Sequence, residues 1–216
     1  MKAKADAISA ASATHLPAEI AQVFADEQQG WRDRGAPAAT IAVGSRLEDF
    51  TLPDATGAEV ALGELVADGP AVIVFYRGGW CPYCNLALRT YQAELLPRLE
   101  AYGARLVAIS PQSPDASLKT RERAELAFDV LSDRGSELAR RLGIAFQPAE
   151  DVLAAQRQLG LDLKEVNAGG SADLPMPTVL IVDGDLTVRF VDARPDYTDR
   201  TEVPEIIAAL EAIDRT

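Results

Sequence analysis

The sequence is poor in residues that bind metals or form permanent disulfides. Its 216 residues include two cysteines and a single histidine, His15. A structural zinc site needs four ligands, so one chain cannot complete such a site from cysteine and histidine. We therefore expect no metal and no other cofactor, and we expect His15 to be an exposed residue beside a helix. A metal-binding dimer that shares cysteines between two chains is a weaker alternative.

The sequence also has little positive charge and no long hydrophobic run. The 21 lysines and arginines against 33 aspartates and glutamates give a formal net charge of −12, which repels the phosphates of nucleic acids and of anionic lipids. The longest apolar runs, near residues 71–76 and 179–182, are far short of the roughly 20 residues that cross a membrane. Residues 1–14 lack the apolar core of a secretory signal. These absences predict a cytoplasmic protein without nucleic-acid or membrane partners.

The length and the hydrophobic fraction of 48% are typical of one domain with a substantial core. Residues 17–34 repeat apolar side chains at helical intervals and are followed by a glycine and a proline. We predict a helical extension over residues 1–40 and a single domain over residues 41–216. The acidic extension is also a candidate contact for a homodimer.

Both cysteines lie in one short motif, Cys-Pro-Tyr-Cys at residues 81–84. The apolar run over residues 71–76 precedes the motif and predicts a buried strand. Residues 81–99 repeat apolar side chains at helical spacing, and the two glycines at 78–79 favour a sharp turn between strand and helix. The motif is therefore predicted to begin a helix at the end of a strand.

The start of a helix favours a thiolate, because the unpaired N–H groups and the helix dipole stabilise negative charge there. Cys81 is therefore the predicted nucleophile, and Cys84, one turn further on the same face, is the predicted resolving partner. Pro82 suits a first helical turn, and Trp80 and Tyr83 are expected to flank the sulfur. A redox dithiol is the favoured interpretation, and a structural disulfide, inert core cysteines or a non-catalytic redox sensor are the alternatives.

The rest of the chain predicts an α/β fold with a mixed central sheet. Residues 104–109 predict a second strand, parallel to the first through a right-handed crossover. Residues 179–191 predict an antiparallel hairpin, and residues 201–213 predict a closing helix. The turn at residues 194–197 is expected to be solvated. Residues 145–173 predict an insertion, with a helix over 149–159 and a loop after it, to which the sequence assigns no role.

This order of elements resembles the thioredoxin superfamily. Two motifs carry the resemblance: Trp-Cys-Pro-Tyr-Cys at residues 80–84, and the segment of Met176, Pro177 and Thr178 before the hairpin. The resemblance implies a three-layer sandwich in which Pro177 follows a cis peptide bond and faces the dithiol. It also implies that Met176 and Pro177 position the substrate through the backbone.

Residues 42–210 are more similar to the peroxiredoxin-like proteins of the alkyl hydroperoxide reductase and thiol-specific antioxidant family, through segments 43–54, 75–81 and 106–133. In that family the first-turn cysteine attacks the peroxide oxygen, which implies this role for Cys81. The threonine and arginine that usually bind the peroxide correspond here to Gly78 and Pro177. Arg77 is the candidate replacement for the positive charge, and the alternative is that Arg77 faces solvent at a strand end.

Two mechanisms follow from these observations. In the first, the dithiol reduces a hydroperoxide, and a thioredoxin- or glutaredoxin-type reductant restores it. In the second, the dithiol exchanges with the disulfide of a protein or small molecule. The motif itself favours disulfide exchange, but the resemblance spans most of the chain and favours a peroxidase. An antioxidant thiol peroxidase is therefore the leading hypothesis.

Overall fold

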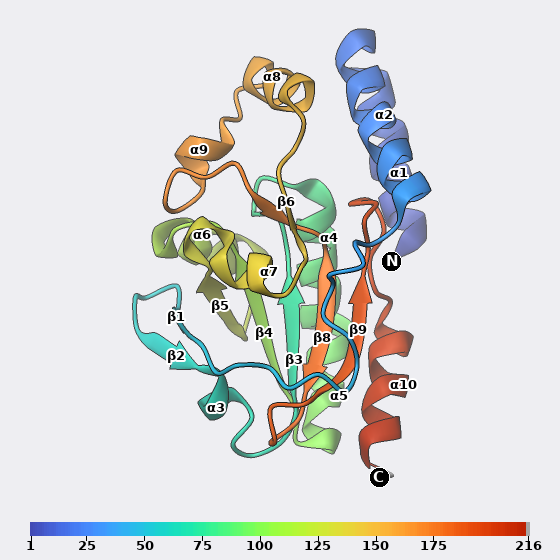
Figure 1. Ribbon diagram of the computed structural model, residues 1–216. Coiled ribbons are helices and arrows are strands. Elements are labelled where there is room, and N and C mark those ends of the chain that lie inside the picture. Colours follow the sequence, from blue (N-terminus) through green and yellow to red (C-terminus); the bar gives the residue numbers. More distant parts are fainter. Residues whose placement is uncertain (215–216) are drawn as a thin grey trace.

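A five-stranded mixed sheet forms the centre of the computed structural model, which describes residues 1–214 (Figure 1). In chain order its strands are β3 (Ala71–Phe75), β4 (Arg105–Ser110), β5 (Asp129–Ser132), β8 (Thr178–Val182) and β9 (Val188–Ala193). They lie side by side in the order β5-β4-β3-β8-β9. β3, β4 and β5 are parallel, β8 is antiparallel to β3, and β9 is antiparallel to β8. The predicted α/β fold with a mixed sheet is confirmed.

The central strands are uninterrupted apolar runs because both faces of the sheet are covered. Every residue of β3 and of β8 is buried, as is typical of strands between two layers. Side chains alternate between the faces. Val72 and Val74 belong to the same core cluster as Cys84, whereas Ile73 and Phe75 belong to the cluster on the opposite face.

Helices form the two outer layers (Figure 1). One layer contains α4 (Pro82–Thr90), α5 (Leu96–Leu99) and α10 (Val203–Asp214). The other contains α3 (Leu62–Leu65) and α7 (Glu137–Arg141). α6 (Pro114–Ala124) packs beside β5 and α4. The helix predicted over residues 81–99 is present. It contains a π-helical turn over Tyr91–Leu95, just before Pro97, which has no N–H to donate. Short 3-10 turns occupy Glu100–Tyr102 and Arg134–Ser136.

Two short antiparallel pairs lie outside the central sheet. The first joins β1 (Thr51–Pro53) to β2 (Glu59–Ala61), and the second joins β6 (Ala145–Phe146) to β7 (Leu174–Pro175). The second pair closes the base of the insertion. The insertion contains α8 (Glu150–Gln158), where a helix was predicted, and also the short α9 (Leu163–Val166), where a loop was predicted.

The extension before the domain consists of two helices, α1 (Lys2–His15) and α2 (Ala18–Arg34). α2 matches the predicted helix. α1 lies within the predicted helical extension, but its bounds were not predicted because its alanine-rich sequence has no apolar stripe; Ala5 is its only buried residue. α1 packs against α4, and α2 packs against α8. His15 is exposed at the end of α1. Within residues 1–214, no helix combines the length and apolar character needed to cross a membrane.

Candidate active site

The dithiol motif lies where β3 ends and α4 begins, as the sequence predicts. Cys81 is the residue before the first turn of α4, and Pro82 is the first helical residue. The Cys81 N–H donates to the Gly78 carbonyl at 3.1 Å, and the Cys81 carbonyl accepts from the Asn85 N–H at 3.1 Å. Both sulfurs are therefore carried by a helix start that backbone hydrogen bonds hold in place.

The two glycines before the motif are required by the space around them. Gly78 has a φ of +150°, and a side chain there would meet the Trp80 indole nitrogen at 2.5 Å. A side chain at Gly79 would meet the Thr120 hydroxyl at 2.3 Å, and the Gly79 N–H donates to the Gln112 amide oxygen at 2.7 Å. Larger residues would displace the turn that positions Cys81.

The two cysteines are free thiols and are both buried, with 1% exposure for Cys81 and 0% for Cys84. Cys81 nevertheless lines a cavity of about 600 Å³, whereas Cys84 lines one of about 10 Å³. Burial argues against a metal shared between two chains, because a second chain could not reach these sulfurs. No cluster of three or more metal-ligating side chains exists within residues 1–214.

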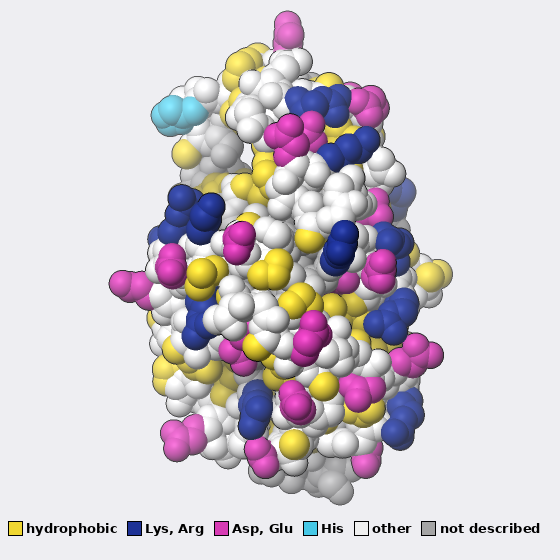
Figure 2. All heavy atoms as spheres, turned by 90° about the vertical axis from the view of Figure 1, so that its left-hand side faces the viewer, with side chains coloured by type: hydrophobic (Ala, Val, Ile, Leu, Met, Phe, Trp, Pro, Cys, Tyr) yellow, Lys and Arg dark blue, Asp and Glu magenta, His cyan; other side chains and the backbone are white. Residues whose placement is uncertain are grey.

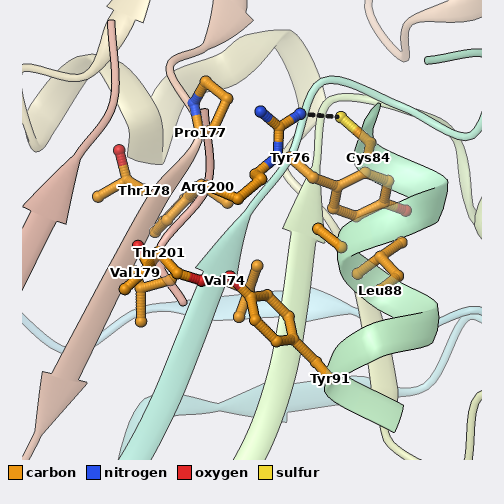
Figure 3. A pocket seen from close by; sticks show the side chains of 12 residues that line it. Val74, Tyr76, Cys84, Leu88, Tyr91, Pro177, Thr178, Val179, Arg200 and Thr201 are labelled. Carbon is orange, nitrogen blue, oxygen red and sulfur yellow. Dashed lines mark hydrogen bonds between the residues drawn. The ribbon is translucent and has the colours of Figure 1, made fainter. Parts of the chain in front are cut away.

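An arginine from a distant loop contacts the second sulfur. The Arg200 Nη2 donates to the Cys84 Sγ at 3.2 Å (Figure 3), and its Nη1 donates to the backbone carbonyls of Tyr197 and Asp199. Arg200 forms no ion pair with a carboxylate of the described chain. A thiolate on Cys84 is therefore its natural counterion.

These contacts favour a negative charge on Cys84 over one on Cys81. Burial opposes ionisation of Cys84, but the hydrogen bond from Cys81 and the charges of Arg200 and Arg77 outweigh it and hold the pKa of Cys84 well below its usual range. Burial, and then the hydrogen bond and charge of Cys84, raise the pKa of Cys81 well above its usual range. The expectation that Cys81 is the acidic sulfur stays a prediction, and the contact between Arg200 and Cys84 favours Cys84 as the site of the negative charge. That prediction used only the position of Cys81 at the helix start, because the contact between Arg200 and Cys84 is not visible in the sequence.

Arg77 is a buried residue of the site and does not face solvent. It is 3% exposed. Its guanidinium carbon lies 4.1 Å from the Tyr197 ring centroid and 5.0 Å from that of Trp80, within the range of a cation–π contact. The Arg77 Nε has no hydrogen-bond partner in the described chain. The site therefore contains two cations, one beside the cavity of Cys81 and one beside Cys84.

The aromatic residues of the motif lie where they were expected. Trp80, Pro82 and Tyr83 line the same cavity as Cys81. The Tyr83 hydroxyl lies 2.9 Å from the Ser9 hydroxyl on α1, which places the extension directly over the motif. Sequence patterns did not indicate this contact.

The loop between β9 and α10 contributes two residues to the site that were not predicted from the sequence, Tyr197 and Arg200. The turn at residues 194–197 was expected to be solvated, but Tyr197 is only 7% exposed. Its ring packs against Tyr83 with centroids 6.0 Å apart, and its hydroxyl accepts from the Gln28 amide at 2.8 Å. The sequence shows only that a tyrosine and an arginine lie in the last loop. Without the fold, these two residues cannot be assigned to the active site.

Met176 and Pro177 differ from the prediction. No peptide bond within residues 1–214 is cis, so the predicted cis bond before Pro177 is wrong. The Met176 N–H donates to the Ile144 carbonyl at 2.8 Å, and the Pro177 carbonyl accepts from the Arg194 N–H at 2.8 Å. The Met176 carbonyl accepts from the Thr178 hydroxyl at 3.0 Å, so the backbone of both residues is hydrogen-bonded within the chain. Pro177 lines the small cavity of Cys84 (Figure 3).

Comparisons with known proteins agree with this fold and motif. Residues 43–191 match the model of the AhpC/TSA family. The thiol-disulfide oxidoreductase ResA of Geobacillus thermodenitrificans is 30% identical over 109 residues, which are 50% of this chain and 61% of ResA. Peroxiredoxin bcp1 of Schizosaccharomyces pombe is 27% identical over 105 residues, which are 49% of this chain and 53% of that protein. The matches thus span about half to three fifths of these relatives.

Solved structures with the same fold include peroxiredoxins. The crystal structure of the peroxidoxin BcpB from Mycobacterium tuberculosis superimposes with a TM-score of 0.63 and 24% identity, over 80% of this chain and 98% of that one. A peroxiredoxin-like protein from Aquifex aeolicus gives a TM-score of 0.63 at 17% identity, over 81% and 88%. At these identities the similarity shows the fold.

Proposed function

Because the chain belongs to the AhpC/TSA family, we propose that it is an antioxidant thiol peroxidase that reduces hydroperoxides through a dithiol–disulfide cycle of Cys81 and Cys84. The observation that supports this most strongly is the contrast between the two sulfurs. Cys81 lines a cavity large enough for a substrate, and Cys84 lies beside the Arg200 guanidinium. One sulfur can meet a peroxide while the other holds the negative charge.

Because Arg200 lies against Cys84, the cycle we propose starts with the proton of the pair on Cys81. The Cys84 thiolate accepts that proton as an internal base, and the resulting Cys81 thiolate attacks the outer oxygen of the hydroperoxide. A sulfur–oxygen bond forms as the oxygen–oxygen bond breaks. Cys81 becomes a sulfenic acid, and the alkoxide takes the proton from Cys84 and leaves as an alcohol. Arg77 is the cation best placed to stabilise the developing charge on oxygen.

The second half of the cycle uses Cys84 as the resolving residue. Its thiolate attacks the Cys81 sulfur, the disulfide forms, and hydroxide leaves and is protonated to water. A thioredoxin- or glutaredoxin-type dithiol then supplies two electrons and two protons to the disulfide and is itself oxidised. Such a cycle suits the cytoplasm, where thiols are kept reduced and a disulfide is transient.

The test is stopped-flow oxidation of the reduced protein by hydrogen peroxide and by a model disulfide, with Cys81→Ser as the control. We expect peroxide to oxidise the protein far faster than it oxidises free cysteine, and Cys81→Ser to lose this reaction. A peroxide reaction no faster than that of free cysteine would overturn the proposal.

A second candidate function is dithiol–disulfide exchange. Two observations favour it: the 30% identity to ResA, and the Cys-Pro-Tyr-Cys motif at a helix start. Exchange needs a reactive sulfur but no group that binds a peroxide. A slow peroxide reaction together with a fast reaction with the model disulfide would support this candidate in place of the first.

A further inference from the structure

The cavity above Cys81 is bordered by the helices of the extension. Residues of α1 and α2 line one side, α8 and the residues after it line another, and the start of α4 with Tyr197 forms the floor. In Figure 2 the surface is hollowed beside the single histidine, at the end of α1, and hydrophobic side chains lie within the hollow. α1 and α2 precede residues 43–191, which match the family model. This side of the site therefore lies outside the part of the chain that the family model describes.

The inward face of α2 contains a charged residue where an apolar one is expected. Ile20, Phe24, Glu27 and Trp31 follow one another at intervals of three or four residues, which places them along one face of the helix. Ile20 is buried, Phe24 lines the cavity, and the Trp31 ring packs against Phe146 with centroids 5.0 Å apart. Such a face normally continues as an apolar stripe. Here a glutamate interrupts it.

The carboxylate of Glu27 is buried without a partner. Both of its oxygens are shielded from solvent, and neither has a hydrogen-bond partner in the described chain. Burial of a carboxylate without hydrogen bonds is strongly unfavourable, and most buried polar groups in proteins are paired. A residue that breaks a local rule at such a cost is typical of functional sites. Glu27 is therefore a candidate for a role other than stability.

Arg77 is a buried cation with no carboxylate in contact. It is 3% exposed and forms no ion pair within residues 1–214. Its Nε has no hydrogen-bond partner there either. Arg77 lines the same cavity as Cys81, and its charge lowers the pKa of that thiol, against the larger effect of burial, which raises it. Any group that offsets the charge of Arg77 therefore changes the ionisation of Cys81.

Glu27 and Arg77 lie on either side of Tyr197. Gln28, the residue after Glu27, donates to the Tyr197 hydroxyl at 2.8 Å, and the Arg77 guanidinium carbon lies 4.1 Å from the centroid of the Tyr197 ring. Burial raises the pKa of Tyr197 to about 12, the charge of Arg77 lowers it, and the charges of Glu27 and Cys81 raise it. All three charged groups are thus close to one ring.

Few other charges face the carboxyl group of Glu27. Burial raises its pKa above the usual range, and the charge of Arg77, from the turn before α4, opposes this most strongly. Asp151 of α8 raises the pKa further, and Arg34 of α2 itself lowers it. Of these charged residues, Arg77 is the one that also lines the cavity of Cys81.

We propose that Glu27 is a positioning residue that acts through Arg77, because its negative charge offsets part of the positive charge that Arg77 presents to Cys81. The inference rests on the proposed function and adds a residue of the extension to that site. When the carboxyl is protonated, the whole charge of Arg77 favours the Cys81 thiolate. As the pH rises and Glu27 loses its proton, the new negative charge opposes the ionisation of Cys81. The reactivity of Cys81 should therefore rise less steeply with pH than that of a lone thiol.

The test follows the alkylation of Cys81 by iodoacetamide across pH, by quenched flow and mass spectrometry, in the Cys84→Ser protein, in which Cys81 is the remaining thiol. In this background Glu27→Gln keeps the shape of the side chain and removes its charge. We expect it to speed the alkylation about three- to tenfold near neutral pH, because a pKa lowered by about half a unit to one unit increases the thiolate by that factor. Its profile should also follow a single ionisation.

Two variants serve as controls. Glu27→Asp keeps the charge and should keep most of the profile of the Cys84→Ser parent. Glu19→Gln removes a charge from an exposed position of the same helix and should leave the profile unchanged. A Glu27→Gln protein that changes only its urea midpoint, with the alkylation profile of its parent, would overturn the inference, since a purely structural role predicts that result.

Arg77→Met in the same background tests the route of the effect. Once the guanidinium is removed, Glu27→Gln should change the alkylation rate by less than about twofold, because residues that act as a unit are not additive. An equal effect with and without Arg77 would overturn the inference. If Arg77→Met does not fold, the profiles of Glu27→Gln and Glu27→Asp decide the question alone.

Alkylation uses no peroxide, so the inference and the proposed function can fail separately. If Glu27→Gln shifts the alkylation profile but peroxide reacts no faster than with free cysteine, the proposed function fails and the role of Glu27 stands. If peroxide oxidises the protein rapidly and Glu27→Gln leaves the profile unchanged, the role of Glu27 fails and the proposed function stands.

Discussion

Cys81 and Cys84 lie three residues apart at the start of one helix, but their surroundings differ in almost every respect. Cys81 faces a cavity of about 600 Å³ with apolar walls, and Cys84 faces one of about 10 Å³ with Arg200 against its sulfur. One sulfur has room for a substrate, and the other has a counterion. The difference shows that tertiary contacts give the two sulfurs different surroundings, although their shared helix start favours a thiolate on either.

Replacing each cysteine in turn is the most direct test of the difference between the two sulfurs and should have the largest effect. Cys81→Ser should lower peroxide turnover by at least about a thousandfold, because it removes the nucleophile. Cys84→Ser should also stop turnover, but should leave one reaction with peroxide. In Cys84→Ser burial still raises the Cys81 pKa, but the charge of the Cys84 thiolate no longer does, and Arg77 and Arg200 remain to lower it. Stopped-flow kinetics and mass spectrometry of the oxidised product measure both effects.

The product distinguishes the two roles. Oxidised Cys84→Ser should carry a sulfenic acid on Cys81 that a dimedone probe traps, whereas the wild type should form the disulfide. Equal loss of the first oxidation step in the two variants would contradict the division of roles. So would a trapped sulfenic acid on Cys84 in the Cys81→Ser protein.

Removing the Arg200 guanidinium should make Cys84 ionise more like an ordinary thiol. Arg200→Met is expected to raise the pKa of Cys84, because the positive charge beside its sulfur is lost, and the ultraviolet absorbance of the thiolate reports this shift. Peroxide turnover near neutral pH should fall about tenfold and recover as the pH rises. Arg200→Lys should keep most of the wild-type profile because it keeps the charge.

Arg189→Met is a matched control, because Arg189 pairs with Asp183 on an exposed part of β9. It should leave the titration and the pH profile unchanged. A wild-type profile in Arg200→Met would show that the charge of Arg200 does not govern the pair.

The pKa directions also predict how the stability of the reduced protein depends on pH. The pKa of Cys84 is lower in the folded state, so the stability it contributes is present above the usual thiol value, about 8.5, and is lost as the pH falls through its folded pKa. The pKa of Cys81 is raised, so its contribution is lost as the pH rises above that value. Stability should therefore peak near the usual thiol pKa.

Urea unfolding under reducing conditions, across this range of pH, measures the effect. Each pKa unit by which folding displaces a thiol is worth about 1.4 kcal/mol. Subtracting the curve of the double variant Cys81→Ser, Cys84→Ser from that of the wild type isolates the thiol pair from other titrating groups, such as Glu27, whose pKa is raised by burial. A difference that does not vary with pH would contradict the assigned charges.

The local part of the site could be predicted from the sequence, and the part assembled from distant segments could not. The apolar run, the two glycines and the cysteine motif are adjacent in the chain, so strand, turn and helix follow from short-range patterns. Arg200 and Cys84 are 116 residues apart, and no pattern near either residue indicates their contact. The acidic sulfur was therefore assigned to Cys81, because only the helix start was visible in the sequence.

The cavity walls illustrate the same limit. α1 has one buried residue and no apolar stripe, so its packing over α4 depends on contacts such as Ser9 with Tyr83. The backbone around Pro177 likewise has distant partners, since Ile144 and Arg194 pair with it. The order of predicted strands and helices gave the mixed sheet, and the family resemblance gave the layered fold, but neither could predict features that this chain builds from its own loops and extension.

The prediction with the smallest expected effect tests whether the contact of α2 with the loop before α10 can be broken without changing the ionisation of Cys84. Arg32 of α2 donates to Asp196 at 2.5 Å, an ion pair between a 45% exposed and a 9% exposed side chain. Arg32→Ala should therefore lower the free energy of unfolding by no more than about 1 kcal/mol, measured with urea. It should not change the thiolate titration, because Cys84 and Arg200 keep their contact. Arg157→Ala, which breaks an exposed pair with Glu150, is the control and should cost less. A shifted titration in Arg32→Ala would mean that the extension and the Cys84 site are coupled through the loop between β9 and α10, and that the contrast between the two sulfurs depends on the extension.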